Sequence, residues 1–109
     1  MPQYKLQEYI EGSKSYFAEW FDSLDAFTAT RVDRYIRRME QGNLGDSKGV
    51  GEGVCELRID FGPGFRIYYG LDHNIIIILL GGGSKRHQSR DIAKAIQSWK
   101  SYKNRKKGG

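Results

Sequence analysis

The sequence predicts an α+β fold with the element order β-α-α-β-β-β-α and a small, mainly antiparallel sheet. Three observations support this class. Residues 54–69 alternate between apolar and polar side chains around a glycine-rich turn, which is typical of a β-hairpin. Residues 75–80 are an unbroken apolar run, which indicates a central strand buried on both faces. Apolar residues recur at helical spacing near both ends of the chain, and we expect those helices to pack on one side of the sheet.

The first part of the chain predicts one strand and a helical hairpin. Residues 4–10 alternate loosely, which predicts a short strand. Two apolar stripes at helical spacing follow, and Gly42 ends the second helix. The stripes consist of Tyr16, Phe17, Trp20, Phe21 and Leu24 in the first helix and Ala29, Val32, Ile36 and Met39 in the second. Residues 42–53 are rich in glycine, and we expect a mobile loop there.

The hairpin reads VCELRIDFGPGFRIYY and turns at Gly62-Pro63-Gly64. In ordinary register, Arg58 and Arg66 project from the same sheet surface on either side of this turn. One interpretation is that they are solvated charges on an open face. The other is that they form one wall of a site for a phosphate group, which the planar guanidinium binds through two parallel hydrogen bonds.

The last part of the chain predicts a turn and a helix. Gly81-Gly82-Gly83 should end the apolar strand and let the backbone turn sharply. A helix then begins at about Ser89, with Ile92, Ile96 and Trp99 on its inner face. Residues 104–109 form a basic tail that we expect to be frayed.

Composition limits the class of protein. At 109 residues the chain is expected to be a single domain, 1–109. The net charge is +5, and half of the 18 basic residues follow residue 84, which favours a polyanionic partner. There is one cysteine, Cys55, so we expect a buried thiol without an intrachain disulfide in a cytoplasmic protein. Only His73 and His87 could supply imidazole ligands, and no metal or other cofactor is expected. No membrane association is expected, because the longest apolar run has six residues and the N-terminus lacks a signal-peptide core.

Cationic and hydrogen-bonding side chains converge from several segments. They are Arg58 and Arg66 in the hairpin, Lys85, Arg86, His87 and Gln88 after the apolar strand, and Lys48 in the glycine-rich loop. Such a cluster can stabilise a phosphate that gains negative charge in a transition state. Tyr68 and Tyr69 add flat rings on which an unpaired base could stack, a combination that favours single-stranded RNA over duplex DNA.

These residues also resemble a known family. ELRIDFGPGFRIYY, the apolar strand and GGGSKRHQSRDI together resemble the RelE/ParE toxin superfamily, closest to its HigB-like addiction module killer protein branch. The resemblance covers nearly the whole chain. It implies a type II toxin that cleaves mRNA on the ribosome, with the ribose 2′-OH as nucleophile. It also implies a cognate antitoxin, of a HigA-like type with a helix-turn-helix, that holds the toxin inactive.

The resemblance assigns roles to individual residues. Arg66 matches the family's arginine in the second hairpin strand, Arg58 matches a basic position on the preceding strand, and either Lys85 or Arg86 matches the cation after the long strand. The roles that this implies are charge stabilisation by Arg66 and Lys85 and binding of flanking phosphates by Arg58 and Arg86. The chain has no counterpart to the catalytic tyrosine of RelE; Ile92 lies near that place.

Proton transfer and further RNA contacts have their own candidates. His87 is the candidate general acid or base, because an imidazole with a pKa of about 6.5 exchanges protons near neutrality; it is otherwise a surface loop residue. Gln88 either orients a phosphate or caps the final helix. Lys48 and Arg90 are further candidate RNA-binding cations.

Two other functions are compatible with this sequence. One is a ParE-like inhibitor of DNA gyrase on the same fold, although such proteins generally lack the catalytic cations. The other is a non-catalytic RNA-binding module. Primer extension or sequencing of RNA ends distinguishes a nuclease from both.

Overall fold

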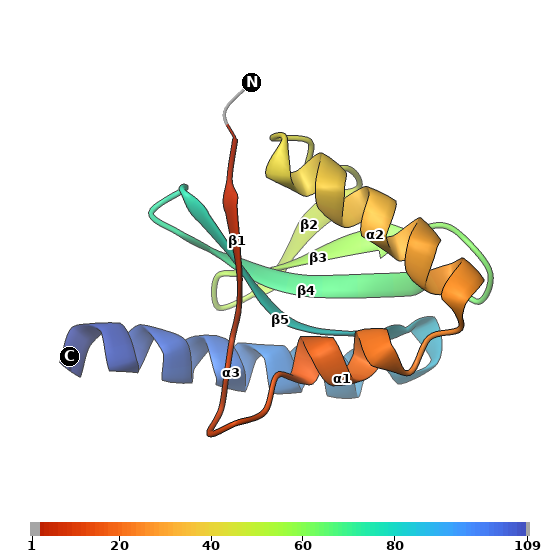
Figure 1. Ribbon diagram of the computed structural model, residues 1–109. Coiled ribbons are helices and arrows are strands. Elements are labelled where there is room, and N and C mark those ends of the chain that lie inside the picture. The colour runs from red at the N-terminus through yellow and green to blue at the C-terminus, as the bar shows by residue number, and fades with distance from the viewer. Residues whose placement is uncertain (1–2, 109) are drawn as a thin grey trace.

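A five-stranded mixed sheet forms the centre of the computed structural model, which describes residues 3–108 (Figure 1). The strand order is β1-β5-β4-β3-β2, with β1 parallel to β5 and every other pair antiparallel. The strands are β1 (Lys5–Glu8), β2 (Ser47–Gly51), β3 (Val54–Ile59), β4 (Phe65–Asp72) and β5 (Ile76–Ser84). The helices are α1 (Tyr16–Asp22), α2 (Ala26–Glu40), the short 3₁₀ helix η1 (Lys85–His87) and α3 (Gln88–Gly108). The α+β class is therefore as predicted.

The helices cover both faces of the sheet, which corrects the prediction that they pack on one side. Residues of α1 and α2, such as Phe17 and Ile36, share a core with Ile67 and Tyr69 of β4. Ala95, Trp99 and Tyr102 of α3 form a second core with Val54, Tyr68, Ile78 and Leu80. Successive strand residues point to opposite faces, so central strands with apolar side chains on both faces require cover on both.

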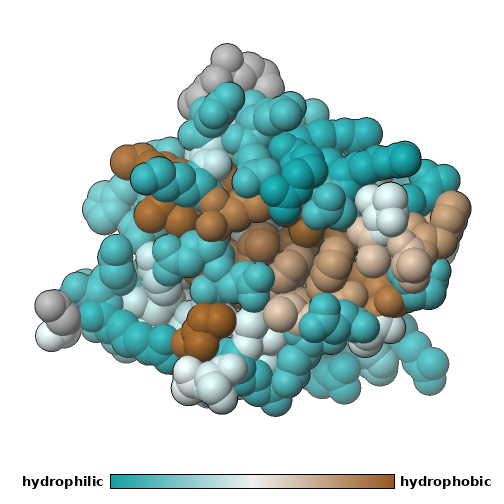
Figure 2. Space-filling view, in the orientation of Figure 1, coloured by the Kyte–Doolittle hydropathy of each residue, from teal (hydrophilic) through white to brown (hydrophobic). Residues whose placement is uncertain are grey.

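The face that carries α2 leaves apolar surface uncovered. Figure 2 shows apolar side chains gathered across the middle of this face and out to the edge where α2 begins. Part of this surface is a pocket of about 350 Å³ between α1, α2 and β1. Its apolar lining consists of Leu6, Phe17, Phe21, Ile36 and Leu79.

The element order contains one strand more than predicted. Part of the expected mobile loop at residues 42–53 is the edge strand β2, in which Lys48 pairs with Glu56 of β3. Glu52 and Gly53 form the connecting turn with φ values of 57° and 87°. Turns with positive φ at both central positions favour Asn-Gly or Asp-Gly. A Glu-Gly pair is therefore a weak signal of a hairpin turn in the sequence.

The three consecutive glycines lie within β5 and do not end it, contrary to the prediction. Their role is to let side chains approach the backbone closely, as glycine in a strand interior often does. A Cβ at Gly82 would lie 2.2 Å from Cε3 of Trp20, and one at Gly83 would lie 2.0 Å from Oδ2 of Asp91. The glycines thus admit Trp20 of α1 and Asp91 of α3 onto the strand.

The basic tail continues α3 to Gly108, so the predicted fraying from residue 104 is wrong for the described residues; Gly109 lies outside them. Arg105 donates hydrogen bonds to the carbonyl oxygen of Ile10 at 2.6 Å and to the hydroxyl of Tyr9 at 2.9 Å. These contacts hold the end of the helix against the segment that follows β1.

Candidate phosphate-binding site

Arg58 and Arg66 are direct cross-strand partners in the β3–β4 ladder, so the prediction that they share one sheet face is confirmed. Their environments differ. The side chain of Arg58 is 54% exposed, whereas that of Arg66 is 6% exposed. One guanidinium is therefore a surface group and its neighbour is almost enclosed.

Three of the predicted cations meet at an open hollow of about 310 Å³ at the tip of the β3–β4 hairpin. The backbone N–H of Lys85 donates to the carbonyl oxygen of Gly64 at 2.9 Å, which fixes the start of η1 against the hairpin turn. The hollow is lined by Asp46, Arg58, Ile59, Asp60, Gly62, Pro63, Gly64, Arg66 and Lys85. The sheet register and this one backbone bond thus bring Arg58, Arg66 and Lys85 together.

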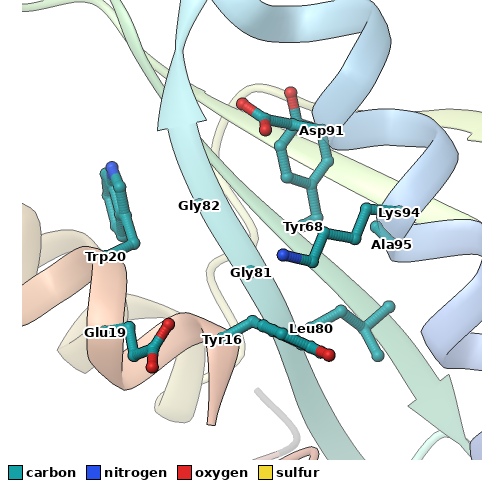
Figure 3. A pocket seen from close by; sticks show the side chains of 10 residues that line it. All are labelled: Tyr16, Glu19, Trp20, Tyr68, Leu80, Gly81, Gly82, Asp91, Lys94 and Ala95. Atoms are coloured by element: carbon teal, nitrogen blue, oxygen red, sulfur yellow. The ribbon is translucent and has the colours of Figure 1, made fainter.

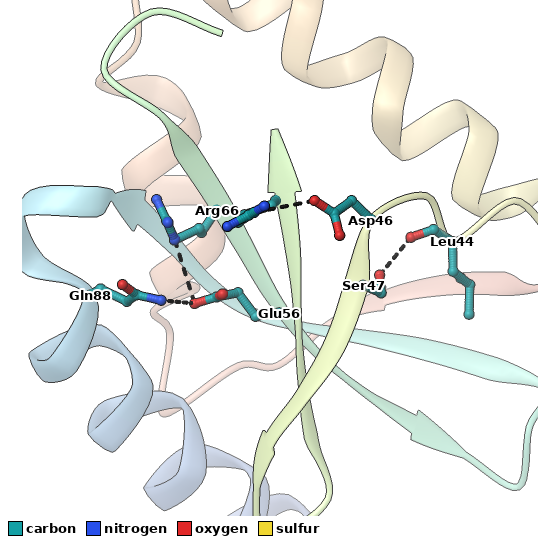
Figure 4. A network of polar contacts seen from close by, with 7 residues as sticks. Leu44, Asp46, Ser47, Glu56, Arg66 and Gln88 are labelled. Atoms are coloured by element: carbon teal, nitrogen blue, oxygen red, sulfur yellow. Dashed lines mark hydrogen bonds and ion pairs between the residues drawn. The ribbon is translucent and has the colours of Figure 1, made fainter. Parts of the chain in front are cut away.

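A buried carboxylate stands behind Arg66 (Figure 4). Glu56 is 0% exposed, and its Oε2 lies 3.6 Å from Nε of Arg66. The side-chain nitrogen of Gln88 donates to the same oxygen at 2.9 Å. Glu56 therefore connects three elements, and Gln88 has a partner that the sequence did not predict. An enclosed ion pair restricts the rotamers of Arg66 and so positions its guanidinium at the hollow.

Carboxylates neutralise only part of the positive charge of Arg58, Arg66 and Lys85. Arg58 pairs with Asp46, with 3.2 Å between Nε and Oδ2, and both side chains are exposed. Such pairs stabilise proteins by about 0–1 kcal/mol, so an incoming phosphate can compete for the arginine. Asp60 also lines the hollow. Among the described residues, Lys85 forms no salt bridge, which leaves its ammonium group available to an anion.

Polar atoms behind the hollow are incompletely satisfied. Within the described part of the chain, Oε1 of Glu56, Nε of Arg66 and the hydroxyl of Tyr68 are buried without a hydrogen-bond partner. Burial raises the pKa of the Tyr68 phenol, and the neighbouring Glu56 carboxylate raises it further. Native proteins retain few such groups, and strain, a catalytic role or a bound water or ion accounts for those that persist.

The stacking role predicted for Tyr68 and Tyr69 is contradicted by their burial, since both are 0% exposed. Strand alternation places one ring on each face of β4, and helices cover both faces. The hydroxyl of Tyr69 donates to Oγ of Ser47 at 2.8 Å, which anchors β2. Both tyrosines are core residues.

Four other predicted site residues are exposed and lie outside the lining of the hollow: Lys48, Arg86, His87 and Arg90. Arg86 and His87 belong to η1, directly after Lys85. Lys48 faces the side of the sheet that carries Arg66, one strand further out than Arg58. Their proposed contacts with RNA stay predictions.

A second pocket, of about 300 Å³, lies between α1 and α3 above β5 (Figure 3). It mixes the charged groups of Glu19, Asp91 and Lys94 with aromatic rings, and neither Arg66 nor Lys85 lines it. Burial raises the pKa of Asp91, against the opposing effect of Arg90 and His87. The sequence alone indicates only that Asp91 is an acid in the first turn of the final helix, where it favours the helix dipole. The sequence signal of the close packing of Asp91 is Gly83, a glycine inside a strand.

Two further observations concern residues 3–108. No helix among them is both long and apolar enough to cross a membrane. No group of three or more His, Cys, Asp or Glu side chains among them could hold a metal ion. Cys55 is half-buried, and burial raises the pKa of its thiol, which lowers the fraction of reactive thiolate at neutral pH.

Fold and site together define an α+β protein with a hollow at one hairpin tip that is lined by three cationic side chains. No family model matches the chain. A protein of Haemophilus influenzae (strain Rd), described as uncharacterized, is 40% identical over 80 residues, which cover 72% of this chain and 81% of that protein. The chain therefore belongs to the same family as this Haemophilus protein.

Proposed function

We propose that the chain is a cytoplasmic type II toxin of the RelE/ParE superfamily, in its HigB-like branch, and that it cleaves mRNA on the ribosome. The observation that carries the proposal is the hollow itself, where Arg66 is held by buried Glu56 beside Arg58 and Lys85. The sequence resemblance supports the same assignment. A rigid, partly enclosed guanidinium is suited to a charge that develops during reaction.

The proposed reaction is a transesterification within the RNA. The 2′-oxygen of one nucleotide forms a bond to the adjacent phosphorus while the bond from phosphorus to the 5′-oxygen of the next nucleotide breaks. A base accepts the proton of the 2′-hydroxyl, and an acid protonates the leaving 5′-oxygen. Arg66 and Lys85 stabilise the negative charge on the non-bridging oxygens, while Arg58 holds a neighbouring phosphate. One such donor is worth about 10²- to 10³-fold in rate.

His87 is the proposed proton-transfer residue. It lies two residues after Lys85 in η1 and is exposed, so an RNA strand across the hollow can reach it. Catalytic hydrogen bonds often tighten only when substrate binds, so its position outside the lining of the hollow is compatible with this role.

A non-catalytic RNA-binding module is the second candidate function. The lining of the hollow includes no histidine that could transfer a proton. That observation favours binding without chemistry.

Brief induced expression followed by sequencing of RNA 5′ ends tests the proposal. We expect growth arrest with new 5′ ends inside messages, and we expect Arg66→Ala or Lys85→Ala to lower cleavage by about 100-fold or more. Lys103→Ala, an exposed cation of α3 outside the lining of the hollow, is the matched control. Arrest with intact transcripts would reject the nuclease. DNA breaks with an SOS response would instead identify a gyrase inhibitor.

The proposed protein partner is a cognate antitoxin of the HigA-like, helix-turn-helix type. To inactivate the toxin it must cover the cationic hollow or displace Arg66. Acidic side chains are suited to the first task because three cations line the hollow.

A further inference from the structure

Among the large apolar side chains of residues 3–108, that of Phe27 is the most exposed, at 64%. It lies in the first turn of α2. Asp25 caps this helix, because its side chain accepts a hydrogen bond from the backbone N–H of Thr28 at 3.2 Å. Single exposed apolar side chains are common and need no explanation. Phe27 is not single. Its ring centroid lies 5.9 Å from that of Phe61, which in turn lies 6.2 Å from that of Phe65.

A cation accompanies these rings. The guanidinium of Arg31, one helical turn after Phe27, lies 4.5 Å from the ring centroid of Phe61 and 5.4 Å from that of Phe27. Arg31 is exposed and forms no salt bridge within the described residues. The surface therefore combines flat apolar rings with a positive charge, which is the composition of platforms that stack nucleic-acid bases.

The aromatic surface formed by Phe27, Arg31, Phe61 and Phe65 is connected to the hollow through the hairpin turn. Phe61 stands between Asp60 and Gly62, both of which line the hollow. The carbonyl oxygen of Phe61 accepts from the N–H of Gly64 at 3.0 Å, and the carbonyl oxygen of Gly64 accepts from the N–H of Lys85 at 2.9 Å. The rings are thus held at a fixed place beside the cations.

We propose that Phe27, Arg31 and Phe61 form a base-stacking subsite. An unpaired base of the RNA stacks on this surface while a phosphate of the same strand occupies the hollow. The inference rests on the proposed function. It assigns the contact with an unpaired base to this surface, because Tyr68 and Tyr69 are buried and cannot contact a base. RNA is favoured over a protein occupant because the surface carries an unpaired cation and adjoins further cations at the hairpin tip.

Binding of a short, fluorescein-labelled single-stranded RNA tests the subsite, with 2′-O-methyl groups to prevent cleavage. Phe27→Ala should weaken binding by about 5- to 100-fold, because it removes one stacked base. Phe27→Tyr keeps the ring and should bind like the wild type. Phe27→Leu keeps apolar surface without a ring and should bind as weakly as Phe27→Ala. Ile75→Ala is the matched control, since Ile75 is 56% exposed at the other end of β4.

Abasic substitution locates the base. When the stacked position of the RNA is made abasic, the difference between the wild type and Phe27→Ala should vanish. Equal affinity of the wild type and Phe27→Ala for intact RNA would overturn the subsite. Wild-type affinity of Phe27→Leu would do the same, because an apolar side chain without a ring would then be sufficient for binding.

Sequencing of RNA 5′ ends in cells separates this inference from the proposed function. Phe27→Ala should still cleave mRNA but should produce fewer new 5′ ends than the wild type, because its loss of a stacked base weakens RNA binding. If the wild type cleaves mRNA and Phe27→Ala matches it in both affinity and the number of new 5′ ends, only the subsite is wrong. If the wild type neither binds nor cleaves RNA, the proposed function fails and the subsite fails with it.

Discussion

The two ends of α3 are tied to the sheet by polar networks that differ in completeness. At its N-terminal end Gln88 bonds to Glu56 of β3, which also pairs with Arg66. At its C-terminal end the hydroxyl of Tyr102 donates to Oδ2 of Asp72 at 2.5 Å, and Lys106 lies 3.4 Å from the same oxygen.

The difference separates a candidate site from an anchor. Both oxygens of Asp72 have partners, because His73 bonds to Oδ1 at 2.6 Å, and the hydrogen bond from Tyr102 is the main cause that lowers the pKa of Asp72. Oε1 of Glu56 and Nε of Arg66 have no hydrogen-bond partner within the described residues, and Arg66 opens onto the hollow. A saturated network stabilises the fold. Arg66, in contrast, both pairs with Glu56 and lines the hollow, where its guanidinium can meet a ligand.

Breaking the Glu56 network should have the largest effect on stability. Glu56→Ala leaves Arg66 enclosed without its carboxylate, so we expect the free energy of unfolding to fall by about 3–5 kcal/mol in chemical denaturation. The double variant Glu56→Leu with Arg66→Met removes both charges and should recover much of that loss while remaining inactive. If Glu56→Ala is as stable as the wild type, the pair of Glu56 and Arg66 does not contribute to the stability of the fold.

Breaking the Tyr102 anchor should have a smaller effect and should spare RNA cleavage. Tyr102→Phe deletes the hydrogen bond to Asp72 and should lower the free energy of unfolding by about 1–2 kcal/mol. Burial and this bond raise the pKa of Tyr102 to about 12, above its usual value of 10.0. Because the folded state favours the protonated phenol, the stabilisation is present below pH 10 and is lost as pH rises through about 12.

Denaturation curves across that alkaline range provide the check. The difference in stability between the wild type and Tyr102→Phe should shrink as the phenol ionises. A difference that stays constant with pH, or a loss of RNA cleavage at neutral pH, contradicts the anchor role.

Breaking the exposed ion pair between Arg58 and Asp46 should have the smallest effect on stability. Asp46→Asn releases Arg58 from its surface partner and should change the free energy of unfolding by less than about 1 kcal/mol. It should also tighten binding of the uncleavable RNA, more so at low salt, because one repulsive carboxylate is removed. Titrations at two salt concentrations measure this, with Asp33→Asn of α2 as the control. Weaker binding by Asp46→Asn would indicate that the carboxylate itself positions the RNA.

Local patterns in the sequence predicted most of the secondary structure. Period-2 alternation placed Arg58 and Arg66 on one face, and the register confirms it. The unbroken apolar run predicted a strand buried on both faces, and Ile77 and Ile78 are both 0% exposed. A strand buried on both faces requires cover on both faces of the sheet. The prediction that all helices pack on one side was inconsistent with this requirement and was wrong. The strand β2 was missed because its turn has an unusual residue at a positive φ.

The sequence by itself determined which residues alternate, which helices are amphipathic and which cations gather near one hairpin. Only the tertiary structure decided how deeply each cation is enclosed. Arg66 is enclosed and held in place because Gln88 and Glu56, 32 residues apart, meet behind it. Phe27 contacts Phe61 because the start of α2 lies against the hairpin turn. Periodicity reports the environment that a residue shares with its neighbours in sequence. Burial and charge pairing depend on segments that meet only after the chain has folded.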